Sequence, residues 1–163
     1  MNKRVAVGLL SLSATGLVAV ANFEGFSPTA YIPIEGDVPT IGFGHTNGVE
    51  MGQTVTVPAA MALLNQDITH AEKAVKSCVN VPLTQRYYDV LVSFAYNIGG
   101  TAFCTSTLVK KLNQGDYTGA CKEILRWDKI KSRNANGEIV YVPVAGLTNR
   151  RKKESAACLA AIE

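Results

Sequence analysis

The chain lacks several features that would place it in a particular class of protein. It has no Cys-x-x-Cys pair and only two histidines among 163 residues, so we expect no metal site and no cofactor. It also lacks internal repeats, low-complexity segments and any dense cluster of lysine and arginine. These absences argue against a nucleic-acid partner, and the length suits one domain or two small lobes.

The chain is weakly basic, with a net charge of +3 and an isoelectric point of about 8.7. Such a balance slightly favours acidic surfaces, for example anionic lipid or bacterial wall polymers. The densest basic run, Arg150 to Lys153, falls in a helical pattern. We expect it to be a solvent-exposed face.

Charged residues are absent between Val5 and Ala21, after a basic start at Lys3 and Arg4. This pattern predicts a secretory signal or a signal anchor, and the alternative is a buried helix of the core. The run is short for the roughly 17–25 residues that span a bilayer, and small and polar residues dilute it. Cleavage after Ala21 would remove any helix that positions Glu24. We therefore favour a retained segment that inserts weakly and can leave the membrane.

All four cysteines lie beyond residue 77. In an exported chain an even number suggests two disulfides, whereas in a cytosolic chain they would be buried thiols. Cys104 and Cys121 flank consecutive predicted helices, and pairing them would leave Cys78 with Cys158. Four cysteines allow three connectivities, so the pairing stays open at this point.

Most of the chain after residue 56 is predicted to be helical. Periodicity and capping residues indicate one helix over residues 57–78, helices that follow Thr84, Thr105 or Ser106, and Asp116, and a last helix over residues 147–162. Proline and glycine exclude a long helix over residues 22–56, where short strands at 31–32 and 40–43 would surround a turn. The Asn136-Gly137 turn and the run 139–142 indicate a second hairpin.

Three carboxylates gather around the first predicted hairpin. Glu24 follows the apolar segment, and Glu35 and Asp37 lie in the turn. A glycosidase needs one acid that protonates the leaving oxygen and a second that activates water or stabilises the cation. This region is therefore a candidate active site, although acids near a hairpin also occur by chance.

Several sequence blocks occur in a characteristic order over residues 22–163: Glu24-Gly25, Ala30-Tyr31, Thr40-Ile41-Gly42-Phe43-Gly44-His45, Phe94-Ala95-Tyr96-Asn97-Ile98-Gly99, Arg126-Trp127 and Gly146-Leu147-x-x-Arg150-Arg151. With these blocks the sequence resembles the phage-type lysozymes, the endolysin muramidases related to the T-even phage lysozyme. The N-terminal segment resembles the signal-anchor-release (SAR) elements of a subset of these endolysins.

The resemblance implies an α+β, predominantly helical fold of two lobes. It implies hydrolysis of the β-1,4 bond between N-acetylmuramic acid and N-acetylglucosamine in bacterial peptidoglycan, which lyses the host cell. The expected parts are an anchor segment (1–21) and a catalytic domain (22–163), made of a β-hairpin lobe (22–56), a connecting helix (57–78) and a helical lobe (79–163). We expect a monomer that residues 5–21 hold inactive at the periplasmic face of the inner membrane before its release into the periplasm.

Glu24 matches the general acid of the family, which works near neutral pH if its pKa is raised. Phe23 and Phe26 would supply apolar surroundings for it. Thr40 matches the threonine whose hydroxyl orients the attacking water. The resemblance implies an inverting hydrolase, in which the two carboxyl groups are roughly 6.5–9.5 Å apart.

The second carboxylate is where this sequence departs from the family pattern, because its usual position is occupied by Pro33. The hairpin is longer and carries Glu35 and Asp37. We prefer Asp37, since it lies close to Thr40 and its backbone is constrained by its glycine and proline neighbours, whereas Glu35 would face solvent. The choice between them stays open, as does a mechanism without a second essential carboxylate.

Tyr96, Asn97, Thr105 and Ser106 correspond to the cleft wall of the helical lobe and are expected to contact sugars. Phe103 belongs to the same wall, and a place in the core is the alternative for Tyr96 and Phe103. His45 is interpreted as a structural hydrogen-bonding residue. Two other functions stay open: a lytic transglycosylase that uses Glu24 alone, and a peptidoglycan-binding or membrane-anchored protein with a decayed site.

Overall fold

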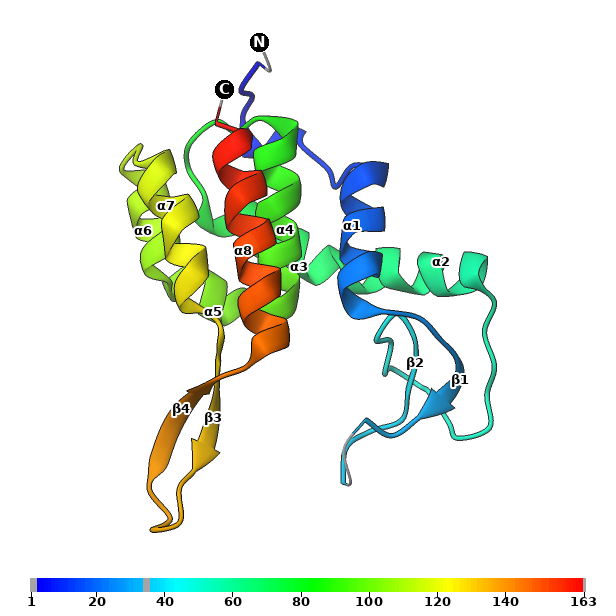
Figure 1. Ribbon diagram of the computed structural model, residues 1–163. Coiled ribbons are helices and arrows are strands. Elements are labelled where there is room, and N and C mark those ends of the chain that lie inside the picture. The colour runs from blue at the N-terminus through cyan, green and yellow to red at the C-terminus, as the bar shows by residue number, and fades with distance from the viewer. Residues whose placement is uncertain (1–2, 34–35, 163) are drawn as a thin grey trace.

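The computed structural model describes residues 3–33 and 36–162, and these residues form a mostly helical body with two small antiparallel hairpins (Figure 1). The elements in order are η1 (Val7–Leu9), α1 (Ala14–Glu24), β1 (Ser27–Tyr31), β2 (Thr40–Gly42), α2 (Val57–Asp67), α3 (Thr69–Cys78), α4 (Gln85–Ile98), α5 (Gly100–Thr105), α6 (Thr107–Asn113), α7 (Tyr117–Glu123), η2 (Ile124–Arg126), β3 (Lys129–Arg133), β4 (Ile139–Pro143) and α8 (Ala145–Ala160). The predicted fold class, α+β and predominantly helical, is confirmed.

Helix α4 is the centre of the helical body and packs against α1, α3, α5 and α8. Its apolar face is fully buried, with Tyr87, Leu91 and Phe94 each at most 1% exposed. Thr84 caps its first turn by accepting the N–H of Tyr87 (3.2 Å). The predicted caps of α4, α6 and α7 are confirmed, because each depends only on residues within one turn.

The predicted helix over residues 57–78 is interrupted at Ile68, which separates α2 from α3. Ile68 keeps helical backbone angles, and it accepts the N–H of Glu72 (3.0 Å). The two helices therefore follow each other directly. This stretch leads from the first hairpin into the helical body.

The N-terminal segment packs on the helical body in this structure. Val7, Leu10 and Val20 are buried in the core, and Val5 forms a β-bridge with Leu83. Leu9 remains 80% exposed. Within residues 3–33 and 36–162, no helix is both long and apolar enough to cross a membrane. Helix α1 ends at the candidate catalytic carboxylate, so packing of the segment determines where this group lies.

The two disulfides join Cys78 to Cys104 and Cys121 to Cys158, with Cα–Cα distances of 5.4 and 5.5 Å. The Cys104–Cys121 pairing that the order of the helices suggested is therefore wrong. The physical reason is packing: α5 lies against α3, and α7 lies against α8. The first disulfide thus links two helices with α4 between them in the sequence, and the second links two helices with η2 and the second hairpin between them.

The two hairpins extend from the same end of the helical body, whereas both chain termini lie at the opposite end (Figure 1). In the first hairpin, β1 pairs with β2 through Ser27–Gly42 and Tyr31–Thr40, with an irregularity between these pairs. Gly42 has φ +64°, and a Cβ there would lie only 2.9 Å from the Cβ of Ala60 on α2. The first hairpin is therefore pressed against α2 at a point where only glycine fits.

Candidate active site

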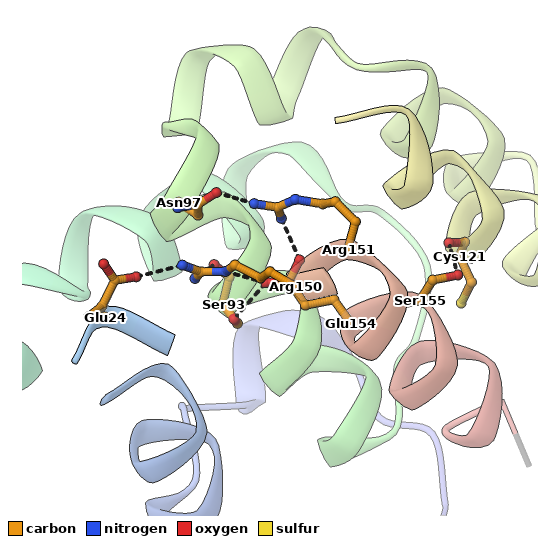
Figure 2. Close-up of polar contacts among 8 residues, drawn as sticks. All are labelled: Glu24, Ser93, Asn97, Cys121, Arg150, Arg151, Glu154 and Ser155. Atoms are coloured by element: carbon orange, nitrogen blue, oxygen red, sulfur yellow. Dashed lines mark hydrogen bonds and ion pairs between the residues drawn. The ribbon is translucent and has the colours of Figure 1, made fainter. Parts of the chain in front are cut away.

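Glu24 is the last residue of α1, and Gly25, with φ 75°, ends the helix and directs the chain into β1. The carboxyl group is partly buried, with 21% of the side chain exposed. Its Oε1 accepts a hydrogen bond from Nη1 of Arg150 at 2.8 Å (Figure 2). Its Oε2 faces Gly44, where a Cβ would lie 3.8 Å away. Glu24 therefore lies between the helical body and the segment that follows β2.

Arg150 belongs to a buried ion cluster built from α8, α4 and the end of α1 (Figure 2). Its Nε donates to Oε1 of Glu154 at 3.0 Å, so its charge is shared between Glu24 and Glu154. Arg151 donates to Glu154 and to Oδ1 of Asn97. The hydroxyl of Ser93 donates to Glu154 at 3.1 Å. Two guanidinium groups thus face two carboxylates.

This cluster corrects the prediction that Arg150 to Lys153 form a solvent-exposed face. Lys152 and Lys153 are exposed, but the side chains of Arg150 and Arg151 are only 8% and 1% exposed. Burial lowers the pKa of Arg151, and Nε of Arg151 has no hydrogen-bond partner among the described residues. Because a buried charge is costly unless it is paired, the cluster holds its members in one arrangement. Glu24 is one of these members.

Aromatic side chains surround the Glu24 end of the cluster. The guanidinium of Arg150 lies over the ring of Phe23, 4.7 Å from its centroid, whereas Phe26 packs on Phe43 at 5.3 Å. Tyr96 is partly buried, and burial together with the charge of Glu24 raises its pKa to about 12. The phenol therefore stays protonated over the physiological pH range.

On the hairpin side of the candidate site, Asp37 and Thr40 both form hydrogen bonds with the backbone of Val38. The N–H of Val38 donates to Oδ1 of Asp37 at 2.9 Å, and the carbonyl of Val38 accepts the hydroxyl of Thr40 at 3.2 Å. Thr40 is buried, and Asp37 is exposed. Glu35, the other candidate carboxylate, lies outside the described residues. Asp37 and Thr40 therefore share one short backbone unit, as their spacing in the sequence suggested.

Comparison with known proteins identifies the group to which this arrangement belongs. Residues 21–154 match the family model described as "Phage lysozyme". The chain belongs to the phage lysozyme family. It is 42% identical over 147 residues to the endolysin of Acyrthosiphon pisum secondary endosymbiont phage 1, covering 90% of this chain and 97% of that protein. It is 37% identical over 159 residues to the SAR-endolysin of Pseudomonas phage phiKMV, covering 98% and 93%.

A solved structure agrees with this assignment. The endolysin from Escherichia coli O157:H7 phage FAHEc1 superposes with a TM-score of 0.83 at 36% identity, over 95% of this chain and 97% of that one. The predicted family, the lysozyme-like fold and the enzyme class, a glycoside hydrolase of the lysozyme type, are therefore confirmed.

The residues of this phage lysozyme that we expected to contact sugars lie in different surroundings. Asn97 is exposed, and its Oδ1 accepts from Arg151. The hydroxyl of Thr105 donates to Thr101 O at 3.0 Å within its own helix, and the buried hydroxyl of Ser106 caps α6. Phe103 is fully buried in the core. Contact of Tyr96, Asn97, Thr105 and Ser106 with substrate stays a prediction.

His45 forms two side-chain hydrogen bonds near the site. Its Nδ1 lies 2.8 Å from Oδ2 of Asp67, and its Nε2 lies 2.9 Å from the carbonyl oxygen of Asn47. This confirms the interpretation of His45 as a structural hydrogen-bonding residue. Over the described parts of the chain, no group of three or more histidine, cysteine or acidic side chains is placed to hold a metal ion.

Glu154 and Ser93 were missed by the sequence reasoning. Glu154 lies three residues after Arg151 and four after Arg150, a spacing that brings side chains together on one helix. That signal was available in the sequence. Ser93 had no comparable signal, because its partner Glu154 is 61 residues away.

Proposed function

We propose that this phage lysozyme hydrolyses the β-1,4 bond between N-acetylmuramic acid and N-acetylglucosamine, with Glu24 as the general acid. The observation that carries the proposal is the fixed position of Glu24, held by Arg150 on one oxygen and directed toward Gly44 with the other. Orientation of this kind favours proton transfer, because the donor must lie within hydrogen-bond reach of the leaving oxygen.

The geometry assigns different tasks to the two oxygens of Glu24. Oε1 accepts from Arg150, which is always charged and can only donate. A proton on the carboxyl group would therefore lie on Oε2, the oxygen that no donor reaches among the described residues. In the proposed reaction Oε2 gives this proton to the glycosidic oxygen. Arg150 would also stabilise the carboxylate that remains.

The water side of the reaction would be handled by Thr40 and Asp37. The only hydroxyl hydrogen of Thr40 is donated to Val38, so its oxygen is available to accept a hydrogen from water. Such a contact would turn a lone pair of the water toward the sugar. Asp37 would take the proton as the water attacks the face opposite Glu24, which is the inverting route.

The first test uses Glu24→Gln, which keeps the shape of the side chain. We expect cleavage of purified peptidoglycan sacculi to fall by roughly 10²–10⁴-fold, the usual contribution of a general acid, with unchanged circular dichroism. Mass spectrometry of wild-type products should show muropeptides with one added water. A 1,6-anhydro product would instead establish a lytic transglycosylase. Full activity of Glu24→Gln would contradict the proposal that Glu24 is the general acid.

The second carboxylate is tested by the matched pair Asp37→Asn and Glu35→Gln. We expect a loss of activity on sacculi of roughly 10²-fold or more for Asp37→Asn and a small change for Glu35→Gln. The reverse pattern would assign the role to Glu35. Equal small effects would support a mechanism with Glu24 as the one essential carboxylate.

We further propose that residues 5–21 anchor the new chain in the host inner membrane, later leave it and pack on the helical body, and thereby release an active enzyme into the periplasm. Docking is supported by polar contacts of the segment. The N–H of Leu12 donates to Glu72 (2.8 Å), and the hydroxyl of Ser13 donates to Asp89 (2.6 Å). A Cβ on Gly16 would lie 2.9 Å from Cγ of Asp89. The small and polar residues that weaken membrane affinity thus also allow the segment to pack on the helical body.

Two variants separate anchoring from docking. Gly8 has open space around it and the side chain of Ser11 is exposed. The double variant Gly8→Leu/Ser11→Leu should therefore strengthen the membrane affinity of the segment without disturbing its packing on the helical body. We expect this variant to delay lysis and to fractionate with membranes, while Asp89→Asn should fractionate like wild type and unfold more easily. Unchanged lysis and fractionation of the leucine variant would count against the anchor.

A further inference from the structure

The hairpin of β3 and β4 is exposed on both faces. Five residue pairs join its strands, from Lys129–Pro143 to Arg133–Ile139. Tyr141 is 67% exposed and Ile130 is 49% exposed. A two-stranded hairpin without a covering layer is at best marginally stable in water, and exposed apolar side chains commonly mark a binding surface. This hairpin therefore has the character of an arm that meets a partner.

One face of this arm is basic and aromatic. Because side chains alternate along a strand, one face of β3 carries Lys129, Lys131 and Arg133. Their cross-strand partners on the same face of the hairpin are Pro143, Tyr141 and Ile139. From Arg126 to Pro143 the chain has four basic and two acidic residues, a local net charge of +2 out of +3 for the whole protein. The stretch therefore has a local excess of positive charge, and Arg126 at its start is paired with Glu123 (3.4 Å), which leaves the lysines and Arg133 to form the basic face.

A hollow lies at the base of the arm, beside this face. Its volume is about 380 Å³, and it is lined by Thr107, Glu123, Arg126, Trp127, Lys129 and Tyr141. The ring of Trp127 packs edge-to-face on Phe94 at 5.9 Å, and the guanidinium of Arg151 lies over the same Phe94 ring at 5.0 Å. The hollow is therefore separated from the ion cluster that holds Glu24 by one aromatic ring.

We propose that the β3–β4 arm binds the peptide stems of peptidoglycan while the glycan lies at Glu24. The proposal deepens the proposed function and rests on it. Stem peptides carry free carboxylates, which complement Lys129 and Lys131. The exposed ring of Tyr141 offers apolar surface beside these charges. An anionic membrane has complementary charge too, but the arm lies at the opposite end of the molecule from the N-terminus (Figure 1).

The decisive experiment measures binding in the Glu24→Gln background, so that cleavage does not consume the polymer. The arm variant is Lys129→Ala/Lys131→Ala, and the matched control is Lys73→Ala/Lys76→Ala, which removes two exposed charges from α3. Three probes are used: purified sacculi, sacculi whose carboxylates have been converted to amides, and vesicles containing phosphatidylglycerol. Binding is followed by co-sedimentation at 50 and 300 mM salt.

We expect the arm variant to bind sacculi about 5–10-fold more weakly at low salt, with the difference fading at high salt because exposed charges are screened. The control should bind like its parent, and amidated sacculi should bind all variants equally weakly. Equal binding of arm and control variants to sacculi would overturn the proposal. So would an arm-dependent loss confined to vesicles, which would assign the arm to lipid.

Cleavage by the same variants with Glu24 restored provides a second, independent reading. The arm variant should show a raised KM for sacculi and an unchanged rate on the same glycan strands after an amidase has removed their peptide stems. An equal loss on both substrates would indicate damage to the catalytic centre and would contradict the proposal that the arm binds peptide stems. Because binding is measured without a working Glu24, failure of the catalytic proposal leaves the binding result interpretable.

Discussion

The two hairpins of this phage lysozyme differ in what lies beneath them. In the first, Ile41 is 4% exposed, and Gly42 lies against Ala60 of α2. In the second, every residue of β3 and β4 is exposed or half-buried. A hairpin pressed against a helix has a fixed position and could hold Thr40, the residue that we propose to orient the attacking water. A hairpin without a covering layer exposes side chains on both faces, and the second hairpin carries Lys129, Lys131 and Tyr141 there, whereas β2 of the first hairpin is buried throughout.

The largest expected contrast comes from alanine at a glycine of each hairpin. Gly42→Ala introduces a Cβ at a positive φ and brings it within 2.9 Å of Ala60, so we expect a loss of about 2–4 kcal/mol in the free energy of unfolding. Gly137→Ala, with φ +78° but open space around it, should lose about 1 kcal/mol. Urea denaturation measures both. Equal losses would mean that the first hairpin is not held against α2 as described.

A smaller effect is expected at the base of the second hairpin, where the hydrogen bond from Lys111 lowers the pKa of Glu123. A carboxyl whose folded pKa is below its unfolded value stabilises the fold above the unfolded pKa, and this stabilisation is lost as the pH falls through the folded pKa. Glu123→Gln should therefore cost up to about 1 kcal/mol at pH 7. The difference from wild type should shrink as the pH falls below about 4.5.

Thermal unfolding between pH 7 and pH 3 measures this difference. Glu50→Gln, an exposed carboxyl in the loop after β2, is the matched control and should follow wild type throughout. A Glu123→Gln deficit that persists unchanged to pH 3 would show that packing, rather than the ion pair, is responsible.

The smallest effect on stability should come from removing most of the second hairpin. Residues 130–142 can be replaced by a short glycine-serine turn, because Lys129 and Pro143 are paired across the ladder. We expect the free energy of unfolding to change by less than about 1 kcal/mol, since few buried contacts are lost, while cleavage of sacculi falls several-fold. Loss of the fold would show that the second hairpin is part of the core and would break the comparison.

Features that depend on neighbours in sequence were predictable. The caps at Thr84, Ser106 and Asp116 follow from side-chain acceptors that reach an N–H three residues ahead. The second hairpin follows from the Asn136-Gly137 turn. The place of Glu24 at the end of a helix also followed from the apolar run that precedes it, together with the family pattern.

Features that depend on distant partners were not predictable in the same way. Arg150 lies in a run of four basic residues and so looked solvent-exposed, but its partner Glu24 is 126 residues away. The disulfides follow the packing of α3 on α5 and of α7 on α8, which the order of the helices does not reveal. Which acid of the first hairpin takes part in the reaction also depends on orientation across the site, and it stays a prediction.

The contact between Arg4 and Ile162 has a consequence for the order of events during synthesis. Nη2 of Arg4 donates to the carbonyl of Ile162 at 2.7 Å, so the first turns of the chain are fastened to its last residues. At about 5–20 residues per second, synthesis from Arg4 to Ile162, which are 158 positions apart, takes roughly 8–30 s. The N-terminal segment therefore leaves the ribosome long before all the residues on which it packs have been synthesised. During this interval the segment can enter another environment, such as the membrane, before the residues on which it packs have been made.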